Sequence, residues 1–486
     1  MAGEARGGGG TREMSAALAV CALYFAVFIA IGFAADRRGS KTAESFYLGD
    51  RNFGAVPTAL SVGASDSSGW VFTGAVGFAY IYGASMMWIC VGYTLGIFCN
   101  YVFVAPALRR FTRQTGAASL PHYFALRFPE CGARLRLASS ALIAVFFTVY
   151  AAGQLTSAGK VFEAAGFSYG AAVWAAAFAA TFYTFLGGYR AVVWTDVAQG
   201  VAILAVLALF PAAFVMQAGG WHAFWAKLWA IDPALLSAGG GHTGASAFAF
   251  AAGLASGGLG LMGQPHILQR FITARDDSSL AHAAVLGVAW VLIQASGSTL
   301  LGLSCHLMLP SVADPEFAFP ALVMQKYNPI IAGVVAAAVF SAILSTLDSL
   351  IVLTAQTVHL DIIEGVCGRK LSERDAKKAA RAVIAAAGLV SALAAASEAR
   401  MIFWFVLYAF AVMGAAFAPP LILSLHWKRT TGRGALCGML AGVAVSVIWY
   451  NVPFLKAQMY EILPAAAASA LATAAVSLAD GRRGRA

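Results

Sequence analysis

Charged side chains are scarce in this chain. Asp, Glu, Lys and Arg make up 11% of its 486 residues, and 60% of the residues are hydrophobic. A typical soluble domain carries about 25% charged residues, so this composition excludes an ordinary soluble protein. Long apolar runs, with a mean hydropathy of +0.76, indicate instead an all-α integral membrane protein.

Motifs of catalysis and metal binding are also missing. The seven cysteines form no CxxC pair and no Cys/His cluster, so neither a disulfide framework nor a zinc site is indicated. The string GQLTSAGKV has five residues between its glycines and no Ser or Thr after Lys160, so it is not a Walker-A motif. No nucleophile and base stand in a recognisable arrangement, and the sequence therefore predicts neither an enzyme nor a bound cofactor.

The apolar runs predict about thirteen transmembrane helices, at about 20 residues for each crossing. No small-residue cleavage site follows the first run, so we expect it to be a retained helix. The runs cover residues 14–35, 55–81, 84–107, 137–164, 167–186, 190–217, 246–270, 280–310, 329–358, 379–397, 400–426, 434–453 and 459–479.

Positive charge alternates between the connecting segments. Most of the 32 lysines and arginines follow odd-numbered helices or lie in the C-terminal tail. The positive-inside rule then predicts a multi-pass protein of the cell inner (plasma) membrane, with its N-terminus outside and its C-terminus in the cytoplasm. Orientation in the lipid bilayer explains the net charge of +10, so no nucleic-acid partner is indicated. Tryptophans in the outside loop 218–245 predict an interfacial helix.

Three aspartates, Asp66, Asp196 and Asp348, lie inside apolar runs. A carboxylate at the centre of a membrane helix costs about 2.5–3.5 kcal/mol on insertion scales, so each of them needs a functional or structural reason. Asp66 lies in ALSVGASDSSGWVF, where glycines and serines favour an unwound segment. The alternative is a continuous helix whose serines bond back to their own carbonyls.

A second interruption is predicted in LASGGLGLMGQPHILQRF, which places four glycines ahead of Pro265. The two interrupted helices are the second and the seventh, five apart. Breaks at corresponding positions of two halves are typical of an inverted repeat with a binding site near the bilayer midplane. Glycine-mediated helix packing is the alternative for the seventh helix alone.

The ninth helix carries a polar stripe in VFSAILSTLDSLIVL. Ser341, Ser345, Asp348 and Ser349 recur on one helical face. Hydroxyls, a carboxylate and nearby unwound carbonyls offer the oxygen ligands that hard cations such as sodium prefer. Hydroxyl bonding between helices is the alternative. Asp196 is expected either to approach this stripe or to form an ion pair with Arg190.

Seven motifs occur in the order found in a known family. They are YLGDRNFG, ALSVGASDSSGW, LPHYFALRF, FFTVYAAG, GGYRAVVWTDVAQG, GQPHILQRF and AILSTLDS. The chain resembles the sodium/solute symporter family over about residues 45–479, most of all its sodium/proline carriers. The resemblance implies a leucine-transporter-like 5+5 inverted repeat with extra helices at both ends.

The implied organisation has five parts. They are an N-terminal tail, first helix and loop (1–54), a first repeat (55–217), an outside loop (218–245), a second repeat (246–426) and a C-terminal helix pair with its tail (427–486).

The implied function is sodium-coupled import of a small organic solute by alternating access, with sodium as the only metal. Proline or a related amino acid is the expected solute; pantothenate, another carboxylate or a sugar acid are the alternatives. A membrane-embedded solute sensor is the alternative from another class.

The resemblance also implies site residues. The sodium site would use Ala64, Ser67, Ala342, Ser345 and Thr346. Relatives similar to sialic acid carriers suggest a second cation site at Asp196, Asp348 and Ser349, where Asp348 alternatively holds a proton. Coupling is assigned to Asp66, Gly69 and Arg51. Solute binding is assigned to Ser68, Trp70, Tyr150, Gly257, Leu261 and Gln264. Gly257 and Leu261 replace an aromatic pair of the proline carriers, which predicts a larger cavity.

Overall fold

The computed structural model describes residues 23–24, 26–35, 37, 42–164, 167–397 and 402–483. Within these residues the chain is helical, and the only β pairing is an isolated bridge between Phe53 and Ala274. Ten of the described helices are long and apolar enough to cross a bilayer. The predicted all-α membrane architecture is therefore confirmed.

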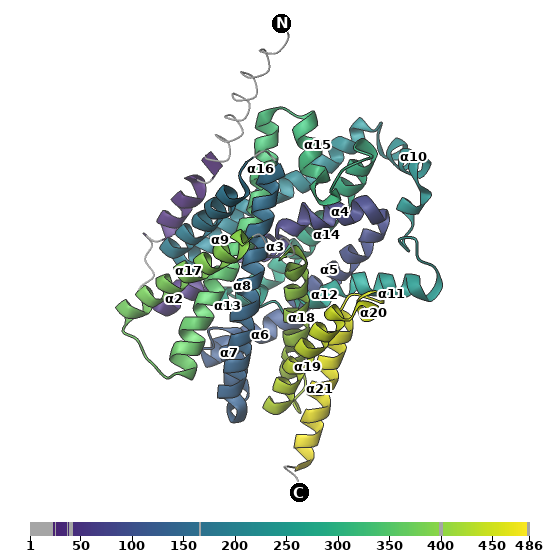
Figure 1. Cartoon of the computed structure of the whole chain (residues 1–486). Helices are drawn as coiled ribbons and strands as arrows, with labels where there is room; N and C mark the ends of the chain where they lie inside the picture. The colour runs from purple at the N-terminus through teal and green to yellow at the C-terminus, as the bar shows by residue number, and fades with distance from the viewer. Residues whose placement is uncertain are drawn as a thin grey trace.

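Helices of very different length make up the described chain (Figure 1). Their bounds are α2 Ala43–Leu48, α3 Ala55–Ser67, α4 Gly74–Tyr82, α5 Met87–Cys99, α6 Ala105–Thr115, α7 Leu120–Arg127, α8 Gly132–Ala164, α9 Tyr169–Gln217, α10 Trp221–Ile231, α11 Gly244–Ala255, α12 Gly257–Leu261, α13 Pro265–Thr273, α14 Asp277–Met308, α15 Ala318–Lys326, α16 Pro329–Gln356, α17 Glu373–Ala396, α18 Ile402–His426, α19 Gly432–Asn451, α20 Pro453–Lys456 and α21 Ile462–Arg483.

The longest helix, α9, contains two predicted crossings. Its 49 residues would extend about 74 Å if straight, against about 30 Å of hydrocarbon. Gly188 has a φ of 56° and kinks the helix between the runs predicted at 167–186 and 190–217. The helical stretch Gly69–Thr115 is likewise longer than one membrane crossing requires. Of the first predicted helix, 14–35, only an apolar part at Ala26–Ala35 is described as a continuous helix; its start lies outside the described residues.

Both predicted helix interruptions are confirmed. Between α3 and α4 the chain leaves the helical conformation at Ser68, which has φ 50° and ψ 172°. Three short helices, α11, α12 and α13, replace the seventh predicted helix. Gln264 has an extended backbone immediately before Pro265, which begins α13. A proline at a first helical position leaves no N–H unsatisfied, so the sequence itself fixes this restart.

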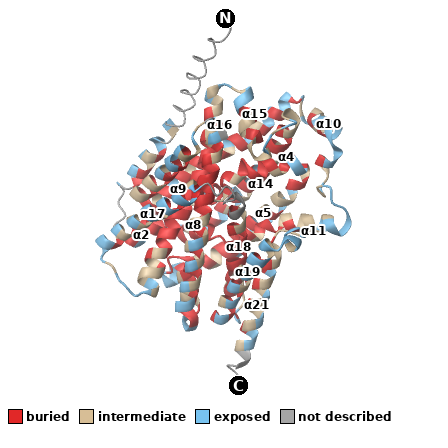
Figure 2. Ribbon diagram, viewed as in Figure 1, coloured by how far each residue is buried: buried red, intermediate tan, exposed pale blue. Residues whose placement is uncertain are grey.

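The core of the molecule is α16. Every residue from Ala337 to Gln356 is buried, and the helix packs against α3, α8, α9 and α17. Figure 2 shows this enclosed centre surrounded by more exposed helices. A helix buried on all sides cannot hydrogen-bond its polar side chains to solvent, so its hydroxyls and its carboxylate need partners inside the protein.

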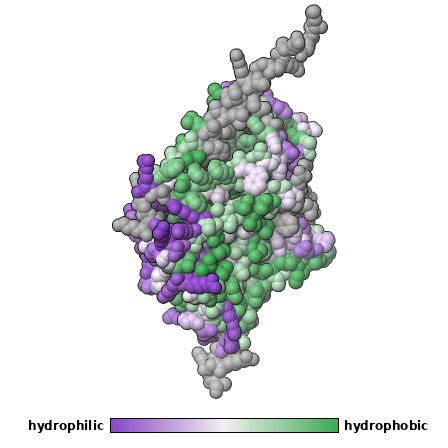
Figure 3. All heavy atoms as spheres, turned by 60° about the vertical axis from the view of Figure 1, so that its left-hand side comes forward, coloured by the Kyte–Doolittle hydropathy of each residue, from purple (hydrophilic) through white to green (hydrophobic). Residues whose placement is uncertain are grey.

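The outer surface suits a lipid environment. Hydrophobic side chains cover a broad middle area of the face in Figure 3, and hydrophilic ones gather toward its lower left. Large apolar residues such as Leu209 and Phe248 are exposed. The loop 218–245, predicted to lie outside, contains the expected helix, α10, on which Trp221 and Trp229 are exposed. Its interfacial position stays a prediction.

Close contact between α5 and the broken seventh helix generates a stability prediction. A Cβ at Gly92 would lie 1.9 Å from the backbone oxygen of Ala255. Because backbone cannot move aside as a side chain can, we expect Gly92→Ala to destabilise the fold by about 1–3 kcal/mol. The measurement is the melting temperature of the purified protein in detergent.

Gly170→Ala is the matched control, since nothing lies within 4 Å of a Cβ at this helical glycine. Alanine there should leave the melting temperature unchanged or slightly higher. Equal melting temperatures for Gly92→Ala and the unmodified protein would contradict the close packing.

Candidate functional site

The break between α3 and α4 is held by side chains from two other helices. The backbone N–H of Ser68 donates to the hydroxyl of Thr346 on α16, at 3.1 Å. The next N–H, of Gly69, donates to Oε1 of Gln154 on α8, also at 3.1 Å. Backbone groups freed inside a membrane protein must be satisfied by protein. The polar residues of the break therefore have a structural reason as well as a proposed functional one.

Gln294 of α14 anchors the same region from the other side. Its Oε1 accepts a hydrogen bond from Nε1 of Trp290 at 2.6 Å and lies 3.0 Å from the Ser67 hydroxyl. The indole packs directly over Gly63, where a Cβ would lie 2.3 Å from the ring. Glycine at this position is therefore required by the close approach of Trp290, independently of any backbone break.

Oxygen atoms from α3 and α16 meet just before the break. The hydroxyl of Ser345 donates to the Ala64 carbonyl at 2.7 Å, and that of Thr346 donates to the Ser65 carbonyl at 2.9 Å. Both hydroxyls also lie near the Ala342 carbonyl, at 3.2 and 3.3 Å. Ser345 and Thr346 are fully buried. This arrangement brings together oxygens of the kind that hard cations bind.

Four of the five predicted sodium ligands, Ala64, Ala342, Ser345 and Thr346, thus lie side by side. The fifth, Ser67, is oriented differently. In a trans peptide the C=O and N–H groups point in opposite directions. Because the Ser68 N–H faces Thr346, the Ser67 carbonyl of the same peptide points away from that hydroxyl.

A charged cluster lies one helical turn away. Arg270 of α13 donates from Nη2 to the Asp196 carboxylate at 2.9 Å and to the Ser349 hydroxyl at 2.6 Å. Its Nε donates to the Ser61 hydroxyl at 2.9 Å, and Ser61 in turn donates to Asp196 at 2.5 Å. Arg270 and Asp196 are 1% and 0% exposed, so this ion pair is fully enclosed.

Asp348 lies beside this ion pair. Its carboxylate accepts a hydrogen bond from the Tyr183 hydroxyl at 2.7 Å and another from Ser349 at 3.2 Å. Asp196, Asp348 and Ser349, the residues of the predicted second cation site, thus belong to one hydrogen-bonded cluster, and their binding of a cation stays a prediction. Arg270 lies among them.

One expectation about Asp196 is wrong and its alternative is correct. Arg190 forms an ion pair with Asp50 instead, whereas Asp196 reaches the stripe of α16 through Arg270. Sequence reasoning missed Arg270 because it lies at the end of a predicted membrane helix, where arginines usually extend into solvent. The available signal was the presence of three carboxylates in apolar runs with no internal cation assigned to them.

The expected solute residues lie around the two breaks. Ser68 accepts a hydrogen bond from the Trp70 N–H at 3.2 Å, and Trp70 is partly buried. Tyr150 is buried, and Asp66 and Tyr93 are partly buried. On the other break, the Leu261 carbonyl accepts from Asn100 at 3.0 Å, and Gln264 donates to the Phe410 carbonyl at 2.9 Å.

The ring of Tyr93 lies beside Gly257, and the expected enlargement of the cavity stays a prediction. A Cβ at this glycine would lie 2.8 Å from the ring of Tyr93, so that ring occupies the space left by the missing aromatic side chain. Tyr93 also stacks on Phe410, with ring centroids 6.1 Å apart. Tyr93 comes from α5, outside the motifs that carry the resemblance, so sequence reasoning could not identify it.

Arg51 does not join the other predicted coupling residues by any described hydrogen bond. It donates to the carbonyls of Thr112, Gly116 and Ala117 at 3.2, 3.3 and 2.9 Å. These carbonyls end α6, so Arg51 stabilises a helix C-terminus.

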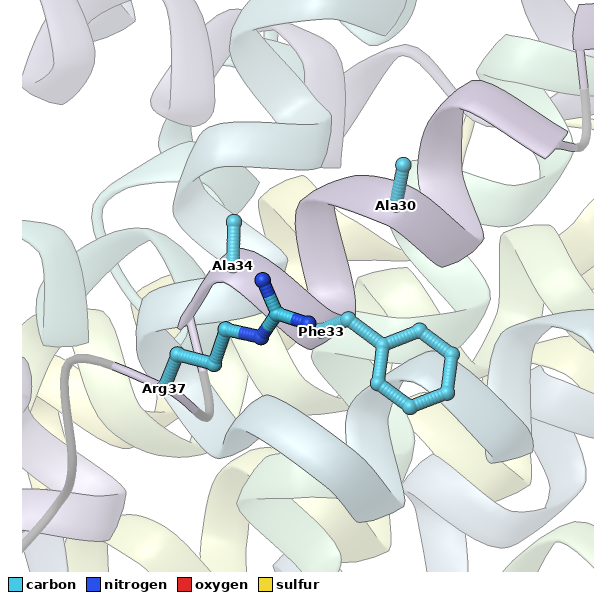
Figure 4. A pocket seen from close by; sticks show the side chains of 4 residues that line it. All are labelled: Ala30, Phe33, Ala34 and Arg37. Carbon is cyan, nitrogen blue, oxygen red and sulfur yellow. The ribbon is translucent and has the colours of Figure 1, made fainter.

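A surface pocket of about 650 Å³ lies elsewhere, along the first helix (Figure 4). Ala30, Phe33, Ala34 and Arg37 line it, and none of the predicted site residues does.

The model of the sodium:solute symporter family matches residues 46–442. The chain belongs to the sodium:solute symporter family.

Its relatives within the family include transporters named for proline. The osmoregulated proline transporter OpuE of Bacillus subtilis is 33% identical over 471 residues, covering 96% of this chain and 95% of the relative. The high-affinity proline transporter PutP of the same organism is 34% identical, with 92% and 95% covered. A sodium/proline symporter of Staphylococcus aureus is 34% identical, with 94% and 91% covered.

Solved structures confirm the leucine-transporter-like fold. The substrate-bound, outward-open form of a Na⁺-coupled sialic acid symporter superposes with a TM-score of 0.80 at 21% identity, covering 95% of this chain and 97% of the other. Mhp1, a nucleobase-cation-symport-1 family transporter, gives a TM-score of 0.54 at 14% identity, with 89% and 95% covered.

The anchoring of the break generates a second prediction. Gln294→Leu removes the acceptor shared by Trp290 and Ser67. Ser67 keeps the Gly63 carbonyl as an acceptor at 2.8 Å, whereas Trp290 Nε1 becomes an unsatisfied buried donor, which costs about 1–3 kcal/mol. We expect a clear loss of thermal stability in the purified protein. The exposed Gln458, changed to Leu in the same way, is the control and should leave the melting temperature nearly unchanged. A Gln294→Leu variant as stable as this control would show that the break is held by other contacts.

Proposed function

We propose that this chain imports proline together with sodium across the plasma membrane. The observation that carries the sodium part is the meeting of Ser345 and Thr346 with the carbonyls of Ala64 and Ser65. Family membership independently assigns sodium-coupled solute transport. The names of the relatives favour proline, and pantothenate, another carboxylate or a sugar acid remain competitors that the same assay can compare.

Sodium is proposed to bind between α3 and α16, with Ala64, Ala342, Ser345 and Thr346 as ligands. The hydroxyl hydrogens that now face carbonyls would turn away, leaving the oxygens of these four residues for the cation. The Ser67 carbonyl is proposed to complete the shell after its peptide rotates, which breaks the bond between Ser68 and Thr346. Sodium binding thereby changes the conformation of the residue next to the solute.

The solute is proposed to lie between the two breaks. Asp66, Ser68, Trp70 and Tyr150 come from the first half, and Gly257, Leu261 and Gln264 come from the second. Tyr93 over Gly257 supplies the aromatic surface that the second half lacks. Gly69, with its N–H on Gln154, is proposed to transmit the ordering of the break to α4.

Coupling follows because Ser67 and Ser68 share one peptide group. The Ser67 carbonyl belongs to the proposed sodium site, and Ser68 belongs to the proposed solute site. If sodium orders the break and the solute binds the ordered form, each ligand must strengthen the binding of the other by the same factor. One sodium moving down about 100 mV releases roughly 2.3 kcal/mol, and an assumed tenfold gradient adds about 1.4 kcal/mol. Together they support roughly 500-fold accumulation of the solute.

The two repeats are proposed to span 55–217 and 246–426, with the N-terminus outside and the C-terminus in the cytoplasm. The alternation of lysine and arginine between connecting segments supports this orientation. Arg51 would then support coupling from the cytoplasmic side, by holding the carbonyls at the end of α6.

Sodium-dependent counterflow tests the proposed function. In proteoliposomes loaded with unlabelled proline, we expect labelled proline to enter in sodium and not in potassium. Pantothenate, a sugar acid and other amino acids, each tested as the internal solute, show which solute exchanges best. Proline counterflow that is equally fast in both salts would refute sodium coupling, and counterflow with another solute alone would refute proline.

A single hydroxyl tests the ion site. Ser345→Ala removes one proposed ligand, and a bond between a hydroxyl and a charged partner contributes about 1.5–3 kcal/mol. We therefore expect the sodium concentration for half-maximal transport to rise roughly 10- to 100-fold, with transport recovered at high sodium.

Ser296→Ala is the control, since this exposed serine on α14 bonds only within its own helix. Its sodium dependence should match that of the unmodified protein. An unchanged sodium requirement in Ser345→Ala would exclude Ser345 as a ligand.

A further inference from the structure

We propose that the guanidinium of Arg270 is the permanent cation of the second cation site, so that the protein binds one exchangeable sodium ion instead of two. The inference rests on the proposed sodium coupling and specifies its stoichiometry. It assigns to Arg270 a positioning role that the sequence motifs do not reveal.

The first step is that Arg270 cannot be neutral or unpaired where it lies. An arginine keeps its charge in proteins, and this one is 1% exposed. A buried charge requires an opposite charge and a full set of hydrogen bonds. Asp196 supplies the charge, and Ser61, Ser349 and the His266 carbonyl complete the acceptors. The Tyr189 ring lies 5.5 Å away and adds a cation–π contact.

The second step is that the donors of Arg270 occupy the oxygens a second sodium would need. Asp196 Oδ2 already accepts from Ser61 and Arg270. The Ser349 hydroxyl accepts from Arg270 at 2.6 Å and lies 2.7 Å from the Ser345 carbonyl, to which it donates. A sodium ion sharing these oxygens would lie next to a fixed positive charge inside a low-dielectric core, where repulsion is strong.

Of the two carboxylate oxygens of Asp196, Oδ1 has no hydrogen-bond partner among the described residues. A single oxygen does not make a sodium site, because hard cations take about six oxygen ligands. If Arg270 were removed, a second ion would have to bind at Asp196 Oδ1.

The third step connects Arg270 to the proposed sodium site. Ser61 lies one turn before Ala64 on α3, and Ser349 lies one turn after Ser345 on α16. Arg270 bonds to both serines, so one side chain of the second half fixes the spacing of the two helices that hold sodium. A sodium ion at the position of the Arg270 guanidinium would dissociate and rebind in every transport cycle, whereas Arg270 remains bound to both serines.

Asp348 has a different role in this arrangement. Arg270 offers one charge to two carboxylates, and its described hydrogen bonds go to Asp196. Asp348 has only the hydroxyls of Tyr183 and Ser349 as described hydrogen-bond partners, and it lies three residues after Ser345. Because no described hydrogen bond joins Asp348 to Arg270, Asp348→Asn should leave the number of bound sodium ions unchanged.

Counting sodium ions on the purified full-length protein tests the inference without knowledge of the solute. Saturation binding of radiolabelled sodium should give one ion per chain for the unmodified protein. Arg270→Gln frees Asp196 and Ser349, so we expect two ions per chain. Arg270→Lys keeps the charge and should give one, and so should Arg270→Gln combined with Asp196→Asn.

Two ions on the unmodified protein would overturn the inference even if Arg270→Gln does not fold. One ion on a folded Arg270→Gln variant would overturn it as well, and so would a changed ion count in Asp348→Asn. These results differ from failure of the proposed function, in which the unmodified protein binds no sodium at all.

Discussion

The structure depends on one constraint, which is that a helix broken inside a membrane protein must have its free backbone groups satisfied by other helices. Ser68 and Gly69 meet this constraint through Thr346 and Gln154. The carbonyls on the other side of the break meet it through Ser345 and Thr346. Because hydroxyl hydrogens and a cation compete for the same oxygens, the contacts that stabilise the break are also those that the proposed sodium ion would replace.

Burial gives the charged cluster its importance. In water, the pairing of Arg270 with Asp196 would contribute little. In the enclosed centre of the bundle, neither group is tolerated alone, so α3, α9, α13 and α16 are held together by one guanidinium. The proposed sodium ligands and the two serines that accept hydrogen bonds from Arg270 lie on successive turns of α3 and α16. Movement of α13 relative to α16 must therefore disturb both.

Much of this organisation follows from local sequence. The all-helical membrane architecture, both interruptions and the polar face of α16 were predicted, because each depends on apolar length, glycine and proline placement or helical periodicity. The partner of Asp196 was not predicted, because Arg190 is near Asp196 in the sequence and Arg270 is 74 positions away. Tyr93 over Gly257 was missed for the same reason: periodicity identifies which face of a helix is polar, and not which distant residue fills a gap opposite it.

The sequence by itself determined the class of protein and the helices that break, because scarcity of charge, runs of about 20 apolar residues and glycine-rich segments act locally. Its motifs also determined family membership. Only the tertiary structure decided which oxygens meet, which cation neutralises Asp196 and which ring fills the space beside Gly257. These depend on the packing of helices separated by up to 281 positions in the chain, and no local pattern specifies a contact at that distance.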